Sequence, residues 1–387
     1  MNNQLKLFRK VNEIVLFDDN MIESAKECFQ DYVEKGIILT TNFEENKWET
    51  TNEYSNVSFI FNLNKFQYKR FYEQVFQLSF DDFVTYLKSF IVLSMEHHVL
   101  ITLQAFLRDI KKLVKEIKVN EVFSLANMKI SNPSVCIDFL STLPCLESNE
   151  LTQLIEQLDE LLNVSYQLNT KKQRKLAQFQ SYFLFNDILN DYWVKSLSDE
   201  ERLFYYPLYL WWQITAVVPL RPREFLLTQR NCLTEKDGKY YLTLRRNNLK
   251  GKDKGVSHKI SEDYYLTTYE VPFKLASEIL NYLELTKDLS STQLDTLFVT
   301  DSHYRKWKRI ASTKNRFLTY SNLNTILKYF FNEIVSQQYG YFVHHINSPN
   351  QLDDHEINFI HIGEALLKLK TVSRSYQEYL TEKHLSL

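Results

Sequence analysis

The sequence predicts a mainly α-helical protein of the α+β class, with one small antiparallel sheet in its C-terminal part. Glycine and proline, which interrupt helices, number only 6 and 7 among 387 residues, far below their average usage. Long stretches of the middle of the chain carry apolar residues at helical spacing. A short extended stretch, NVSFIFNL, occurs early, but consecutive segments of alternating pattern, rich in β-branched and aromatic residues, appear after residue 231.

The pattern divides the chain into three regions: residues 1–78, 79–195 and 196–387. The first mixes short helical and extended stretches, and its sequence indicates no function. The second contains helical patterns and ends in a basic linker, NTKKQRKLAQ. The third begins with helices, continues with strands and returns to helices. A chain of this length is expected to hold two or three domains.

The third region opens with a helix near Ser198, because Asp199 and Glu200 place acidic groups in its first turn. The run 203–220 that follows is uncharged for 18 residues, which is close to the length of a membrane span. It contains Pro207 and several polar residues, and its aromatic residues are not gathered at its ends. We therefore expect a buried core helix and no membrane association; a membrane protein is the alternative.

Three strands are predicted next, in the segments NCLTEKDG, KYYLTLRRNN and YYLTTYEVP. Asp237 and Gly238 form a plausible tight turn between the first two strands. The connection to the third strand, LKGKDKGVSHK, is long and basic. Helices resume with FKLASEILNYLEL and SNLNTILKYFFNEIVSQQ.

Charge is distributed unevenly along the chain. The formal net charge is −2, yet residues 1–60 carry −5 and residues 221–260 carry +7. A second basic run, 303–317, interleaves aromatic residues with Arg305, Lys306, Lys308 and Arg309. Local charge, more than net charge, decides whether a protein attracts a polyanion, so these segments favour contact with nucleic acid. A solvated surface is the alternative for both.

The segment PLRPREFLL concentrates groups that suit phosphate binding. Pro222 fits the first position of a helix, which puts Arg221 at the helix entrance. Glu224, three residues on, is close enough to orient that guanidinium. A planar, permanently charged fork binds phosphate well. Taken alone, the segment fits a solvated helix start better than a phosphate site; the elements around it reverse that preference.

This motif and the order of elements around it resemble the catalytic domain of the tyrosine recombinases, the phage-integrase family. The resemblance covers about residues 196–362, and the helical region before it is more weakly similar to the family's core-binding domain. It implies a clamp around double-stranded DNA, a tetramer on DNA when active, and strand exchange through a 3′-phosphotyrosine without a cofactor or metal. The role would be integration or excision of a mobile element.

The resemblance also implies roles for single residues. Arg221 corresponds to the family's first active-site arginine and Glu224 to its supporting acid. Lys250 is the closest match to the lysine that protonates the leaving 5′ oxygen, with Lys252 and Lys254 as neighbouring candidates. The expected DNA contacts are Arg223, Arg245, Arg246, Lys252, Lys254, Arg305, Lys306, Lys308 and Arg309.

The match departs from the family after residue 364. The approach to the second box, HEINFIHIGE, includes His361, but Leu366 stands where an arginine would suit. The third His/Trp element is not found. Tyr376 is the candidate nucleophile, with Tyr379 beside it. We expect a shortened C-terminal end and weak or absent strand cleavage.

The remaining features are less specific. The four cysteines form no CxxC pair, and no signal peptide is predicted, which favours a reduced cytoplasmic chain. Four histidines near residues 344–361 match no metal-ligand spacing. Two alternatives to a recombinase stay open: a catalytically dead DNA-binding relative, and a helical scaffold that binds protein.

Overall fold

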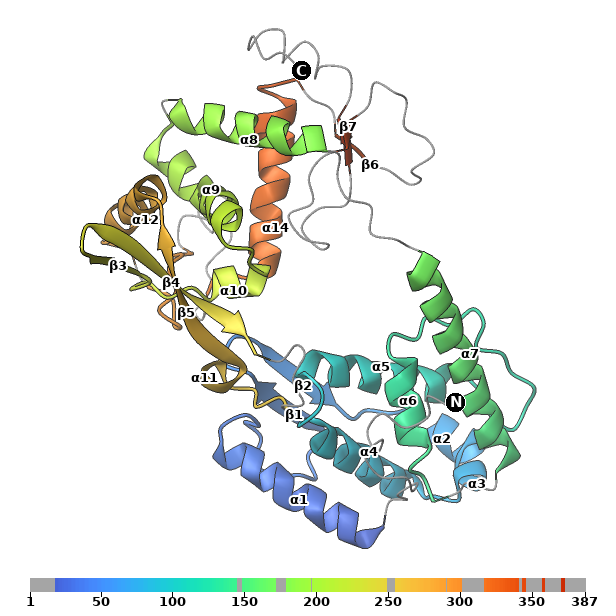
Figure 1. Cartoon of the computed structure of the whole chain (residues 1–387). Coiled ribbons are helices and arrows are strands. Elements are labelled where there is room, and N and C mark those ends of the chain that lie inside the picture. Colours follow the sequence, from blue (N-terminus) through green and yellow to red (C-terminus); the bar gives the residue numbers. More distant parts are fainter. Residues whose placement is uncertain are drawn as a thin grey trace. The chain divides into compact units, whose positions relative to one another are not determined.

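A computed structural model describes residues 18–144, 148–171, 179–195, 197–248, 255–289, 291–300, 317–340, 343–345, 357–358 and 370–372. The chain divides into two compact units (Figure 1). Unit 1 comprises Met1–Gln173 together with Asn248–Asp263, and unit 2 comprises Arg174–Asn247 together with Tyr264–Leu387. Each unit is described by itself.

The described residues are mainly helical, as the composition predicts. Their strands form three small sheets, ordered β1-β2, β3-β4-β5 and β6-β8-β7, and every pairing is antiparallel. The sequence predicts only the second of these sheets.

Unit 1 consists of helices around a two-stranded hairpin. Side chains of Asp18, Asn64 and Ser79 accept hydrogen bonds from backbone N–H groups at the first turns of three of its helices, which stabilises those helix starts. The elements of unit 1 are α1 (Asp19–Glu34), β1 (Lys47–Thr51), β2 (Asn56–Ile60), α2 (Lys65–Phe71), α3 (Glu73–Phe76), α4 (Phe80–Ser94), α5 (Leu100–Glu116), α6 (Pro133–Leu140), α7 (Asn149–Lys171) and α11 (Ile260–Asp263).

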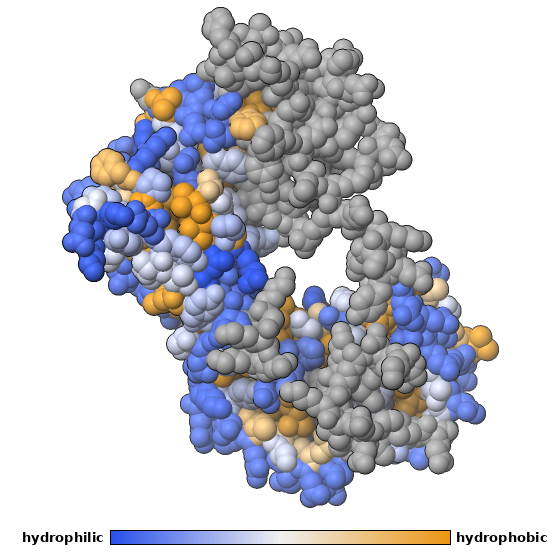
Figure 2. Space-filling view, in the orientation of Figure 1, coloured by the Kyte–Doolittle hydropathy of each residue, from blue (hydrophilic) through white to orange (hydrophobic). Residues whose placement is uncertain are grey.

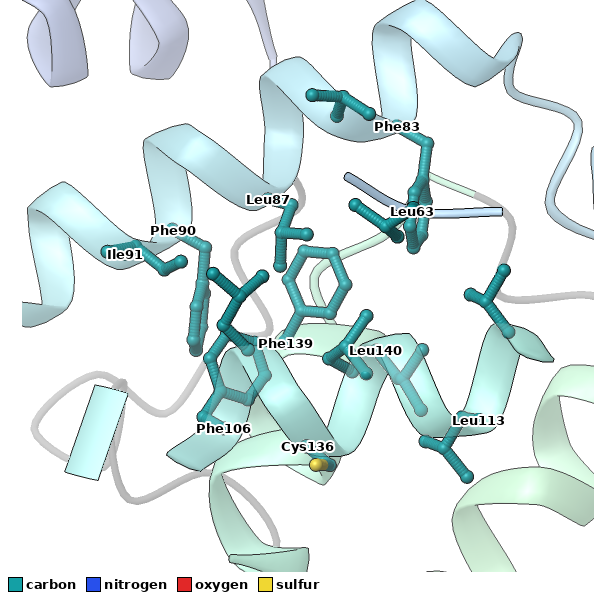
Figure 3. Packing of buried hydrophobic residues seen from close by; sticks show 14 of the residues in the cluster. Leu63, Phe83, Leu87, Phe90, Ile91, Phe106, Leu113, Cys136, Phe139 and Leu140 are labelled. Atoms are coloured by element: carbon teal, nitrogen blue, oxygen red, sulfur yellow. The ribbon is translucent and has the colours of Figure 1, made fainter. Parts of the chain in front are cut away.

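The core of unit 1 is rich in aromatic rings. Phe139 of α6 points toward α4, near Leu87 and Phe90 (Figure 3). Its ring centroid lies 5.2 Å from that of Phe90 and 5.7 Å from that of Phe106. The buried cluster runs from Phe29 to Leu158, so the residues on both sides of the predicted boundary at 78 share one core. Separate roles for the two regions stay a prediction.

Unit 2 packs helices against a three-stranded sheet, and α12 lies beside β4 (Figure 1). The elements of unit 2 are α8 (Phe179–Val194), α9 (Asp199–Val217), α10 (Pro222–Leu226), β3 (Leu233–Lys236), β4 (Lys239–Asn247), β5 (Tyr264–Val271), α12 (Phe273–Leu285), α14 (Tyr320–Tyr329), the π-helix η1 (Phe330–Ser336), β6 (Val343–His345), β7 (Ile357–Asn358) and β8 (Lys370–Val372).

Helix α9 confirms the predicted buried helix. Ser198 caps it. The Ser198 side chain accepts a hydrogen bond from the N–H of Glu201, and the Glu201 side chain accepts one from the N–H of Ser198, which is a capping box. Residues 204–211 are all buried, including Pro207 inside the helix. Among the described helices, none is long and apolar enough to cross a membrane.

The hairpin of β3 and β4 also confirms its prediction. Asp237 and Gly238 both have positive φ, 52° and 71°, as a two-residue type I′ turn requires. Strand β4 then pairs with β5 in a register that sets Leu242 opposite Tyr269 and Arg246 opposite Tyr265. The sheet therefore has the order that the sequence predicts.

Part of the connection between β4 and β5 belongs to unit 1, which the sequence does not predict. We call its residues 255–263 the strap. The N–H of Val256 donates to the carbonyl of Glu96 (2.6 Å), and the N–H of Ile260 donates to the carboxylate of Glu53 (2.6 Å). The buried His258 ring lies 2.9 Å from the carbonyl oxygen of Met95. The strap is thus fixed to the rest of unit 1.

Candidate functional site

Arg221 stands at the entrance of α10, where the motif predicts it. Its backbone is extended, and Pro222 begins the helix. The N–H of Arg221 donates to Oε2 of Glu224 (2.9 Å), and its Nη1 lies 3.4 Å from Oε1. The Glu224 residue is 2% exposed, whereas the Arg221 side chain is 49% exposed. A buried carboxylate therefore orients an exposed guanidinium.

Aromatic packing fixes Glu224. The next residue, Phe225, is fully buried, and its ring lies 5.0 Å from that of Trp211 in α9 and 4.7 Å from that of Phe298. Rings at such distances pack favourably. Helix α10 has only five residues, so this packing, more than helix propensity, holds the motif in place.

Strand β4 brings a second arginine to the same carboxylate. Nη1 of Arg246 donates to the carbonyl of Pro219 (2.8 Å), and its Nε lies 3.9 Å from Oε2 of Glu224. The N–H of Asn247 donates to Oε1 of Glu224 (2.9 Å). Glu224 thus joins the start of α10 to the end of β4, and Arg221 and Arg246 both lie against it.

The other arginines of this segment differ in role. Arg245 donates from Nη1 to the carbonyl of Leu227 (2.7 Å), which ties β4 to the end of α10. Arg223 is exposed on α10. Arg230 donates to the carbonyl oxygens of Leu297 and Thr286. Its guanidinium therefore joins the end of α12 to the segment that contains Leu297.

Figure 2 shows mostly hydrophilic residues over this part of unit 2, interrupted by small apolar patches. The exposed apolar residues of unit 2 include Leu266 of β5 and Phe273 of α12.

Several predicted site residues lie outside the described residues, and their roles stay predictions. They are Lys250, Lys252, Lys254, Arg305, Lys306, Lys308, Arg309, His361 and Tyr376.

Two buried side chains of unit 2, those of Cys232 and Tyr209, have raised pKa values. Burial raises the pKa of the Cys232 thiol to about 12. Burial also raises the pKa of Tyr209 in α9 to about 12, with the Glu278 carboxylate adding to the effect. Both groups therefore stay protonated near neutral pH. Within the described ranges, no three His, Cys, Asp or Glu side chains gather as metal ligands.

No protein-family model matches the chain, and neither a curated protein nor a solved structure is detectably similar to it.

Proposed function

We propose that the chain binds double-stranded DNA through unit 2 and is of the tyrosine-recombinase type, with reduced or absent strand cleavage. The observation that carries this proposal is the exposed Arg221 guanidinium, held by the buried Glu224 at the start of α10. Arginine in a fixed orientation binds phosphate oxygens with paired, charge-assisted hydrogen bonds. The order of α9, the arginine motif and the β3-β4-β5 sheet supports the family resemblance.

The missing second arginine box supports reduced cleavage. Loss of one preorganised donor to the transition state costs roughly 10²–10³ in rate. A catalytically dead DNA-binding relative is the second candidate, favoured by Leu366 at the place of that arginine.

A mobility-shift assay and a nicked suicide DNA substrate test both candidates. We expect DNA binding at low salt and covalent adduct far below that of an intact recombinase assayed in parallel. Adduct at the intact enzyme's rate, lost in Tyr376→Phe or Tyr379→Phe, would show that cleavage is unimpaired. No binding even at low salt would refute the proposed function and leave a protein-binding scaffold.

A further inference from the structure

We propose that Arg221 and Arg246 together bind one phosphodiester group, and that Glu224 is the residue that positions both. The inference rests on the proposed DNA binding and names the site within unit 2 that performs it. The ligand class is a backbone phosphate of DNA.

The first argument is proximity. Nη1 of Arg221 lies 3.4 Å from one oxygen of Glu224, and Nε of Arg246 lies 3.9 Å from the other. Two guanidiniums that share one carboxylate are close enough to share one tetrahedral phosphate. One carboxylate against two guanidiniums also leaves the cluster with a net charge of +1.

The second argument is that Glu224 leaves donors of both arginines available. Charge-assisted N–H···O bonds are about 2.7–2.9 Å long, and strong arginine–carboxylate pairs are bidentate. Both guanidinium contacts to Glu224 are longer than this. The shorter bonds to its oxygens, each 2.9 Å, come from the backbone N–H groups of Arg221 and Asn247. Because each guanidinium has five N–H donors, donors remain for a ligand.

The third argument is rigidity. Arg246 is fixed at its tip by the carbonyl of Pro219 (2.8 Å), in the turn that leads from α9 to α10. Its side chain is 24% exposed, against 49% for Arg221. Arg246 is therefore held in place while part of its surface faces solvent. A preorganised donor of this kind loses little conformational entropy when it binds.

The test is a double-mutant cycle on binding of a short DNA duplex, followed by fluorescence anisotropy at several salt concentrations. We expect Arg221→Ala and Arg246→Ala each to weaken binding roughly tenfold and to lower the slope of log K against log salt by about 0.9. The double variant should lower the slope by about 0.9 as well, because all three variants stop neutralising the same single phosphate.

The matched control is Lys236→Ala, which removes one exposed charge from the far end of the same hairpin. It should leave the affinity and the slope nearly unchanged. Glu224→Gln gives a second readout. Because it removes a negative charge, simple attraction predicts tighter binding of DNA. If Glu224 positions both arginines, the variant binds DNA more weakly, and this is the result that we expect. Thermal melting confirms that each variant is folded. If Arg246→Ala is not folded, Arg246→Lys takes its place, because it keeps the charge but loses the planar fork.

Two results would overturn the shared site while leaving DNA binding intact. One is an Arg246→Ala variant that behaves like Lys236→Ala. The other is a double variant whose slope falls by twice the single change, which would place the arginines on separate phosphates. A wild-type chain that does not bind the duplex would instead refute the proposed function, and the shared site with it.

Discussion

Glu224 illustrates how one buried carboxylate can organise a basic surface. Its oxygens accept hydrogen bonds from backbone N–H groups of two elements and lie near two guanidiniums. Removing one partner of a buried charge leaves part of its desolvation penalty without compensation. The motif therefore depends on the end of β4 as much as on its own residues, and that dependence cannot be seen in PLRPREFLL alone.

Phe139 gives a prediction for the core of unit 1. Its side chain is fully buried and its ring contacts those of Phe83, Phe90 and Phe106. We expect Phe139→Ala to lower the free energy of unfolding by about 3–5 kcal/mol, because the transfer energy of the ring is lost and a cavity is left. Urea denaturation measures the change. Phe66→Ala is the matched control, since Phe66 is 68% exposed; an equal loss in both variants would contradict the packing described.

At the scale of elements, the predictions that succeeded rest on local chemistry. Ser198 begins α9, and Asp237-Gly238 turns the β3-β4 hairpin, because short-range bonds and positive φ angles decide those features. The link from Glu224 to Asn247 spans 23 positions, and the bond from Glu53 to Ile260 spans 207. Contacts this distant follow from tertiary packing, so the sequence predicts neither the Arg246 arrangement nor the strap.

Gly255 is the residue on which docking of the strap depends. A Cβ at this position would lie 2.8 Å from the carbonyl oxygen of Glu96, a backbone atom that cannot move aside easily. We expect Gly255→Ala to displace the strap and to speed tryptic cleavage after Lys259. Gly36→Asn is the control, because Gly36 has open space around it and Asn tolerates its positive φ. Unchanged protection of Lys259 in Gly255→Ala would contradict the docking.

His258 gives a prediction for the pH dependence of stability. Burial lowers the pKa of His258 below its ordinary value of 6.5, although the Met95 carbonyl and the Asp263 carboxylate act in the opposite direction. The unfolded chain therefore binds a proton more readily than the folded chain, so stability falls as pH drops through about 6.5. Melting temperatures at pH 7.5 and 5.5 should show this loss, and His258→Gln should reduce it. A loss of the same size in the variant would assign the effect to other groups.

At the scale of the whole molecule, charge segregation matters more than the net charge of −2. The acidic first 60 residues and the basic segment 221–260 would cancel in any count over the full chain. Lys259 of the basic segment does lie 3.9 Å from Glu53 of the acidic one, but screening limits the field of each charge to about 8–10 Å at physiological salt, so the charges nearest a bound polyanion count more than the total. The affinity for a polyanion should then depend on where along the chain a positive charge is removed, and not only on how many are removed.

Two triple variants with the same loss of charge test this. Changing Lys250, Lys252 and Lys254 to Gln removes three charges from the basic segment, and changing Lys26, Lys35 and Lys47 to Gln removes three from the acidic one. We expect the first variant to lower the salt slope of DNA binding by up to about 2.7, at about 0.9 for each phosphate that is no longer neutralised. The second should change the slope little, since its lysines are exposed and paired with neighbouring carboxylates. Equal effects in both variants would mean that DNA responds only to total charge, and the basic segment would lose its assigned role.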